Sequence, residues 1–322
     1  MNDAPLSLAT AHANLGWPSP DAIKHPAGAG AGVFAALARD KIGRAISHFN
    51  DAQDAVVGVL TADPESSGTE SPIAVVVEFQ REVSATTLRE LQRLAWNFSH
   101  SPALITIEPN CIRVWSCCEH PSTTRPLTDF VVHQLGTSDF LTSTAQTLER
   151  AATRALHWIN LVSGQFFNEH VSRFARDGRA DQMLLGNLRH IRDKLAASGL
   201  NDDDVCHDLL ARIIFVQFLF DRKDSDGNAA LTPAKLTRLQ ADGVLRRAHS
   251  NFASILSDFD ETYRLFDWLN GKFNGDLFPG KGDTPTSRAR GWALERKVVT
   301  KIHLSILADF IGGTFDLSLI HI

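Results

Sequence analysis

The run Ile73–Phe79, IAVVVEF, constrains the fold of this chain more than any other segment. It is almost continuously apolar and rich in valine, and this pattern is typical of a strand that is buried on both faces of a sheet. The segments around it alternate between strand-like and helix-like patterns. Together they predict an α/β layer domain at this end of the chain.

The other elements of this domain have shorter signals. They are predicted at 33–49 (helix), Ala55–Leu60 (strand), Ala85–Asn97 (amphipathic helix), Ala103–Ile107 (strand) and Ile112–Ser116 (strand). Ser84 precedes the second helix and is a suitable N-cap, because its hydroxyl can accept a hydrogen bond from the first turn. We therefore expect the α/β domain to occupy residues 33–120.

The second half of the chain has a different pattern. From Phe140 to Gly312 nearly every segment reads as helix, and Val205–Phe220 is apolar almost all round, as expected of a central buried helix. One apolar stripe is formed by Leu184, Leu185, Leu188, Ile191 and Leu195. Segments 255–269 and 294–310 complete the bundle, and Gly312 with Gly313 closes the last helix. The sequence thus predicts a mobile lead-in at 1–32, a linker at 121–139 and an all-α domain at 140–316.

Composition excludes several classes of protein. The chain has 322 residues, of which 43% are hydrophobic, and a formal net charge of −5, so it is not basic as a whole, although a local basic patch can still bind nucleic acid. Its four cysteines form no C-x-x-C pair, which argues against a zinc site and fits a reducing cytoplasm. No stretch approaches the roughly 18 apolar residues of a membrane span, and the start lacks the pattern of a secretory signal. We expect a cytoplasmic protein of about two domains with no membrane partner.

The last six residues, LSLIHI at 317–322, match the translation of a transposon end that is used to prepare sequencing libraries. We interpret them as an adapter scar and exclude them from the fold. On this interpretation the natural protein continues beyond residue 316.

Glu78 and Gln80 lie two positions apart on one predicted strand, so their side chains share a face. A buried carboxylate needs a partner or a metal ion. The order of strand with carboxylate, helix, strand, turn and strand with Trp, read in VVVEFQ and in ALITIEPNCIRVWS, resembles the core of PD-(D/E)xK nucleases.

This resemblance implies a magnesium site. Glu78 takes the position of a metal-binding carboxylate, Gln80 that of the family's lysine, and Asp54 that of the upstream aspartate, with Asp63 as a rival. Gln80 departs from the family because it has no ammonium group. The alternative interpretation is a nuclease-like fold that has lost catalysis and only packs or binds.

Two helical segments resemble another family. DDDVCHDLLARIIFVQFLFDRKD is similar to the LL.R.LF..FL.DR helix of N-6 adenine DNA methyltransferases, and FDETYRLFDWLNGKFNGDLFP is similar to their F..L…FNG.LF signature. Phe273–Pro279 is the best-matched run. The two resemblances together indicate the front of a single-chain restriction–modification enzyme.

The methyltransferase resemblance implies the activity of an intact protein. S-adenosylmethionine would donate a methyl group to N6 of an adenine flipped out of double-stranded DNA. The Gly-rich turn and the Asn/Asp-Pro-Pro-Tyr/Phe motif of that family are not in these 322 residues, so they are expected downstream. A specificity subunit or domain is a further expected partner, and phage defence the expected setting. Two alternatives stay open: a non-catalytic DNA-binding or assembly module, and a nuclease or helicase-type defence component.

The densest basic cluster precedes the buried helix. It comprises Arg173, Arg176, Arg179, Arg189, Arg192 and Lys194. Arg189, Arg192 and Lys194 are the DNA-binding residues that we predict, because Arg189 and Arg192 lie three apart on one helix and can contact phosphates. The alternative is an ordinary solvated face.

Overall fold

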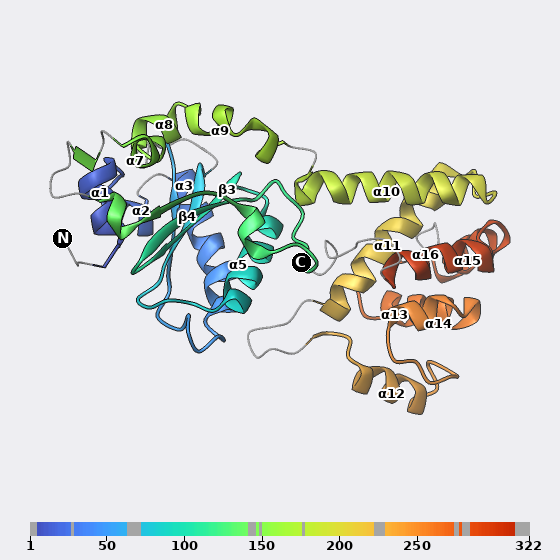
Figure 1. Ribbon diagram of the computed structural model, residues 1–322. Coiled ribbons are helices and arrows are strands. Elements are labelled where there is room, and N and C mark those ends of the chain that lie inside the picture. The colour runs from blue at the N-terminus through green and yellow to red at the C-terminus, as the bar shows by residue number, and fades with distance from the viewer. Residues whose placement is uncertain are drawn as a thin grey trace. The chain divides into compact units, whose positions relative to one another are not determined.

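The computed structural model of the chain divides into two compact units, residues 1–182 and 183–322 (Figure 1). The structure describes residues 5–26, 29–62, 72–140, 146–147, 150–175, 178–221, 229–273, 277–278 and 284–312. The predicted scar at 317–322 lies outside these residues. In the described part of the chain, no helix combines the length and the apolar character needed to cross a bilayer.

The first unit is built on one mixed sheet of five strands (Figure 1). The strands are β1 (Val56–Leu60), β2 (Ala74–Glu78), β3 (Ala103–Glu108), β4 (Cys111–Ser116) and β5 (Val131–Gly136), and they lie in this order across the sheet. β2 and β3 are parallel, and the other neighbouring pairs are antiparallel. The mixed α/β class predicted for this unit is confirmed, and so are the four strands expected from the sequence.

The interior strand β2 is buried on both faces, as its apolar run predicts. Ala74 and Val76 pack into one hydrophobic cluster, and Val75 and Val77 pack into a second cluster on the opposite face. This alternation explains why nearly every position of the strand is apolar, since each face contacts its own layer of helices.

Helix α5 (Ala85–Phe98) connects the parallel strands β2 and β3. The Ser84 hydroxyl accepts a hydrogen bond from the backbone N–H of Thr87 at 3.2 Å, so the predicted N-cap is confirmed. Leu91 and Ala95 are fully buried against the sheet. A parallel pair requires such a crossover, and the position of this helix fixes the direction of β3.

The expectation of a mobile lead-in at 1–32 is wrong for residues 5–26. This segment forms α1 (Leu8–Leu15) and α2 (Pro20–Lys24), and the buried Leu15 and Trp17 join the hydrophobic cluster of Ala74 and Val76. The Trp17 indole donates to the carbonyl of Leu156 at 2.8 Å. Burial of these apolar side chains stabilises a segment whose Ala, Pro and Gly content suggested disorder.

The predicted domain boundary also moves. The helices α7 (Ala151–Ala155), α8 (Trp158–Val162) and α9 (Gln165–Glu169) pack against the sheet with Leu156, Leu161 and Phe166, so they belong to the first unit. The expected linker at 121–139 contains the edge strand β5. The first unit therefore extends to residue 182, beyond the expected limit of residue 120.

Helix 33–49 of the prediction is built in three pieces. α3 (Ala29–Ala38) continues through a π-helical turn at Arg39–Gly43 into α4 (Arg44–Ile46). Ile42 and Ile46 are fully buried beside β1 and α5.

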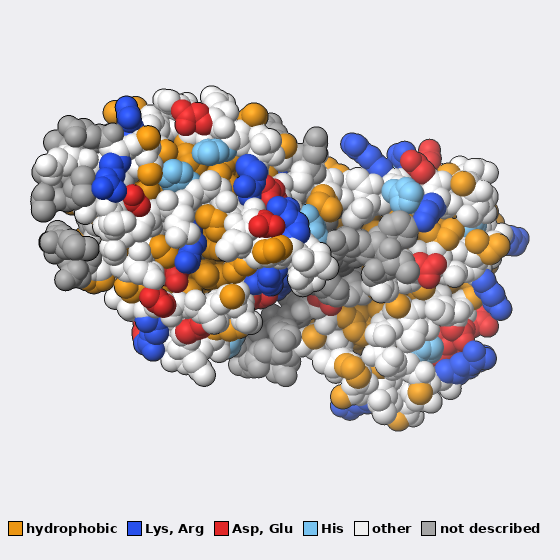
Figure 2. All heavy atoms as spheres, viewed as in Figure 1, with side chains coloured by type: hydrophobic (Ala, Val, Ile, Leu, Met, Phe, Trp, Pro, Cys, Tyr) orange, Lys and Arg blue, Asp and Glu red, His pale blue; other side chains and the backbone are white. Residues whose placement is uncertain are grey.

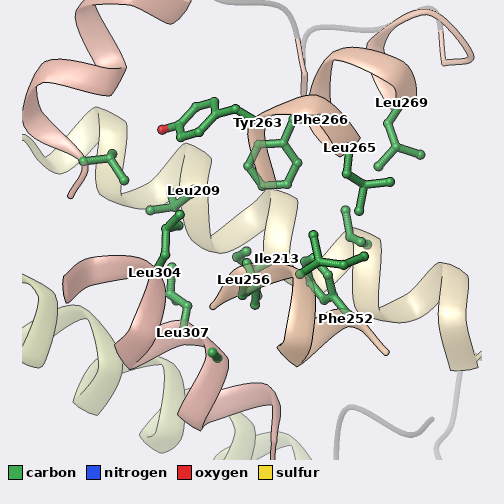
Figure 3. Close-up of a cluster of buried hydrophobic side chains, with 14 of the residues drawn as sticks. Leu209, Ile213, Phe252, Leu256, Tyr263, Leu265, Phe266, Leu269, Leu304 and Leu307 are labelled. Carbon is green, nitrogen blue, oxygen red and sulfur yellow. The ribbon is translucent and has the colours of Figure 1, made fainter. Parts of the chain in front are cut away.

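The second unit is helical. Its helices are α10 (Ala180–Ala197, which begins just before the unit boundary), α11 (Asp203–Asp221), α12 (Pro233–Ala241), α13 (Phe252–Leu256), α14 (Phe259–Asn270), α15 (Pro285–Val298) and α16 (Lys301–Ile311). Figure 3 shows Leu209 and Ile213 of α11 among side chains from α13, α14 and α16. This arrangement confirms the central buried helix that the sequence predicts.

Two of the expected helices are divided. Segment 255–269 is broken at Ser257 and Asp258, where the Asp258 carboxylate accepts the backbone N–H of Glu261 and begins α14. Segment 294–310 is broken at Thr300, which begins α16. In the apolar stripe of α10, Ile191 is buried but Leu185 is 46% exposed.

Candidate functional site

The three residues of the nuclease resemblance lie near one end of the paired strands β1 and β2. Glu78 ends β2 and is paired in register with Val56 at the start of β1. Asp54 precedes Val56 by two residues, and Gln80 follows Glu78 by two. The antiparallel pairing thus brings Asp54 and Glu78 to the same end of the hairpin, as a metal site of this kind requires.

The side chain of Glu78 is committed to the N-terminal segment. Glu78 is only 7% exposed and points to the same face as Ala74 and Val76, where α1 packs. Its Oε1 atom accepts the backbone N–H of Leu8, the first residue of α1, at 2.8 Å. A carboxylate is favourable at this position because the first turn of a helix has free N–H groups and a positive dipole end.

Asp54 and Gln80 lie in a different environment. Asp54 is exposed and forms an ion pair with Arg81, with Oδ2 and Nη2 2.8 Å apart. Gln80 is also exposed. Among the described residues, no hydrogen bond or ion pair joins any two of Asp54, Glu78 and Gln80. Asp63, the rival for the upstream position, lies outside the described residues.

This arrangement does not fit a magnesium centre. Magnesium in proteins usually takes one or two carboxylates together with water and substrate oxygens, so the carboxylates must be open to the substrate. Glu78 is covered by α1, and Asp54 is bound to Arg81. Within the described ranges, no group of three or more His, Cys, Asp and Glu side chains is placed to hold a metal ion.

The sequence analysis missed a second buried carboxylate, which lies at the same end of the sheet as Glu78. Glu108 ends β3, is 3% exposed, and accepts hydrogen bonds from the Arg113 guanidinium and from the backbone N–H of Val83. Alternation along neighbouring parallel strands places it on the face opposite to Glu78. The signal was available, because ALITIE ends on an acid after an apolar run just as AVVVE does.

Glu108 and Arg113 lie in a hollow of about 610 Å³ beside α5, β4 and β5. The polar groups of this hollow bind one another: the Arg113 Nε–H donates to Gln134 Oε1 at 3.2 Å, and the amide of Asn110 donates to Glu82 at 2.7 Å. Burial and the neighbouring Glu108 carboxylate raise the pKa of the Cys111 thiol to about 11. A thiol with such a pKa is not a nucleophile at neutral pH.

The predicted DNA-binding residues lie on α10. Arg189 and Arg192 are exposed, and Arg192 pairs with Asp193 at 3.0 Å, whereas Lys194 is partly buried. All three lie on one helix, as the sequence predicts, and their binding to DNA stays a prediction. In Figure 2 basic and acidic side chains are interspersed on the visible face of each unit, without a continuous basic stripe there.

The rest of the basic cluster is structural. Arg173 binds Glu119 and donates to the carbonyl of Asp129 at 2.7 Å. Arg179 binds the Ser99 carbonyl and pairs with Asp181 at 3.1 Å. Arg176 lies outside the described residues.

The two segments of the methyltransferase resemblance meet in the core of the second unit. Arg212, the arginine of the LL.R.LF pattern on α11, donates from Nε to the carbonyl of Leu277 at 2.6 Å. Phe278 is buried, and its ring lies 5.6 Å from that of Phe215. Of the run Phe273–Pro279, residues 274–276 and Pro279 lie outside the described residues.

Comparisons of the chain with protein-family models, with curated proteins and with solved structures found no match.

Proposed function

We propose that this chain is the front part of an adenine-specific DNA methyltransferase of a restriction or phage-defence system. The observation that carries the proposal is the pair of helical segments that resemble that family. The contact between Arg212 and Leu277 supports it, because two segments that are more than sixty residues apart and share one resemblance also share one partly buried hydrogen bond.

In the intact enzyme, S-adenosylmethionine would supply the methyl group that is transferred to the exocyclic amine of adenine. The residues that hold this cofactor belong to the family's catalytic domain, which we place after the helical unit. The 322-residue chain alone would bind and position DNA, and would not methylate it.

Within this enzyme we propose that the α/β unit is a binding or assembly module rather than a magnesium-dependent nuclease. The environment of Glu78 favours this second assignment, because its carboxylate is buried and accepts the N–H of Leu8. The exposed pair of Asp54 with Arg81 favours it as well.

Methyl transfer tests the first proposal. The protein expressed from the full reading frame of its gene is incubated with duplex DNA and with S-adenosylmethionine that carries a labelled methyl group. Label recovered as N6-methyladenine supports the proposal, and DNA without label contradicts it. The 322-residue chain serves as the inactive control.

DNA nicking tests the second proposal. The chain is assayed on supercoiled plasmid with and without Mg²⁺, beside a Glu78→Ala variant. We expect no magnesium-dependent nicking from either protein. Nicking by the unmodified chain that is lost in the variant would restore the nuclease assignment.

A further inference from the structure

The second unit contains a cavity of about 570 Å³ that the sequence analysis did not single out. This cavity is broadly open to solvent and is lined by the loop after α12, by α14 and by α15. Its lining residues are Val244, Arg246, Asp260, Arg264, Asp267, Trp268 and Arg296. Three arginines and two aspartates therefore surround one tryptophan.

The arginines of this cavity have few close carboxylate partners, although Asp267 interacts electrostatically with Arg296 and Arg264. In the described part of the chain, neither Arg246 nor Arg296 has a carboxylate oxygen within 4.0 Å, and Arg264 reaches only Glu261, at 4.0 Å. The neighbouring Arg247, in contrast, pairs with Asp258 at 2.6 Å. Guanidinium groups that face a cavity without a carboxylate in direct contact can bind an anion from outside the protein.

Hydrogen bonds to Glu261 fix the backbone of the loop that carries Arg246. The buried carboxylate of Glu261 accepts the backbone N–H groups of Arg246 at 2.8 Å and of Arg247 at 3.2 Å. His249 adds a further contact, with Nε2 3.5 Å from the same carboxylate. The two hydrogen bonds to Glu261 hold the backbone in place and leave the Arg246 side chain exposed at the cavity.

Aromatic rings hold the surrounding cations. The ammonium groups of Lys235 and Lys272 lie 5.7 and 5.8 Å from the centre of the Trp268 ring. The Arg296 guanidinium lies 4.5 Å from the centre of the Tyr263 ring. A cation–π contact positions a cation without cancelling its charge. The cavity and its rim thus hold more cationic than acidic side chains.

We infer that this cavity binds backbone phosphates of a DNA strand. The inference rests on the proposed function and adds to it the surface by which the helical unit contacts DNA. Guanidinium groups match phosphate oxygens in geometry, and several cations around one cavity can contact successive phosphates. Binding of this kind positions DNA and does not read its sequence.

The test is DNA binding by the full 322-residue chain, measured as the fluorescence anisotropy of a labelled 20-base-pair duplex at several salt concentrations. We compare the unmodified chain with Arg246→Gln/Arg296→Gln. The matched control is Arg44→Gln/Arg238→Gln, because these two arginines are exposed and each already pairs with an aspartate. We expect the cavity variant to bind about tenfold more weakly or worse, and the slope of log K against log salt to fall by about two. The control should stay within about twofold of the unmodified chain.

Circular dichroism reports whether the variants fold. If the double variant does not, Arg246→Glu replaces it, since the Arg246 side chain is exposed, and it should weaken binding as well. Equal binding by the cavity variant and the unmodified chain overturns the inference and leaves the methyltransferase proposal standing. Absence of DNA binding by the unmodified chain at low salt also overturns the inference, and the methyl-transfer assay on the intact protein then decides the proposed function separately.

Discussion

Arg212 and Glu295 form a buried ion pair in the helical unit, in which one guanidinium nitrogen contacts both carboxylate oxygens. The Arg212 Nη1 atom lies 2.7 Å from Glu295 Oε1 and 2.8 Å from Oε2, and the two side chains are only 2% and 8% exposed. The Tyr263 hydroxyl donates to the same carboxylate at 3.0 Å, and the Arg212 guanidinium lies over the Trp292 ring. One polar network therefore joins α11, α14, α15 and the carbonyl of Leu277.

We expect Glu295→Ala to lower the free energy of unfolding by about 3–5 kcal/mol, because it leaves the buried Arg212 charge with only the half-exposed carboxylate of Asp208, at 3.8 Å. Chemical denaturation of both proteins measures the change. The control is Asp242→Ala, which removes an exposed partner of Arg238 and should cost at most about 1 kcal/mol. An equal loss of unfolding free energy in the two variants would contradict the larger contribution that we assign to the buried pair.

Tyr263 gives a pH-dependent prediction, and it is the only tyrosine of the chain. Burial, the Glu295 charge and the hydrogen bond to Glu295 raise its pKa well above the ordinary value. A raised pKa in the folded state contributes stability that is complete below the unfolded value, near pH 10, and is lost as pH rises through the folded value.

The folded protein should therefore show no tyrosinate absorbance at about pH 11, whereas the protein in guanidinium chloride titrates near pH 10. Above about pH 10, ionisation of Tyr263 in the unfolded chain lowers the free energy of unfolding. Tyr263→Phe removes this contribution, so the free energy of unfolding of the variant should fall less steeply with pH in this range. Titration of the folded protein near pH 10 would contradict the buried position of Tyr263.

The role of Glu78 as a cap for α1 can be separated from a catalytic role. Glu78→Ala removes the acceptor of the Leu8 N–H and should destabilise the first unit by about 1–3 kcal/mol. Glu78→Gln keeps an acceptor oxygen and should cost less. Hydrogen exchange at the first turn of α1 measures the loss directly. Unchanged exchange in Glu78→Ala would contradict the capping role.

Two glycines make a matched pair for packing. A Cβ atom at Gly58 of β1 would lie 2.6 Å from the Ile23 carbonyl oxygen of α2, whereas one at Gly186 of α10 would meet nothing within 4 Å. Gly58→Ala should destabilise the protein by about 1–3 kcal/mol. Gly186→Ala should stabilise it by about 0.5–1 kcal/mol, because it improves the helix propensity of an exposed site. Thermal unfolding of both variants checks the opposite signs.

Strong local patterns predicted much of the fold. The apolar run of β2, the Ser84 cap of α5 and the apolar helix α11 all form as expected. Weak local patterns failed, because long-range burial decides their structure. Leu8 and Leu15 are buried in one cluster with residues of the sheet, and β5 pairs with β4 along its open side.

The candidate site was harder to predict than the fold. The sequence correctly places Glu78 at a strand end near Asp54, but the partner of Glu78 is the N–H of Leu8, seventy positions earlier in the chain. The cavity at Trp268 combines residues from α14, α15 and the loop after α12, and no single segment carries its pattern. Such sites depend on tertiary packing, which periodicity in one segment does not encode.

The most direct measurement for the central claim is the DNA sequence of the source gene past the codon for Asp316. We predict that the reading frame continues into a Gly-rich strand–turn segment and an Asn-Pro-Pro-Tyr or related motif. A stop codon directly after Ile322 would contradict the methyltransferase assignment.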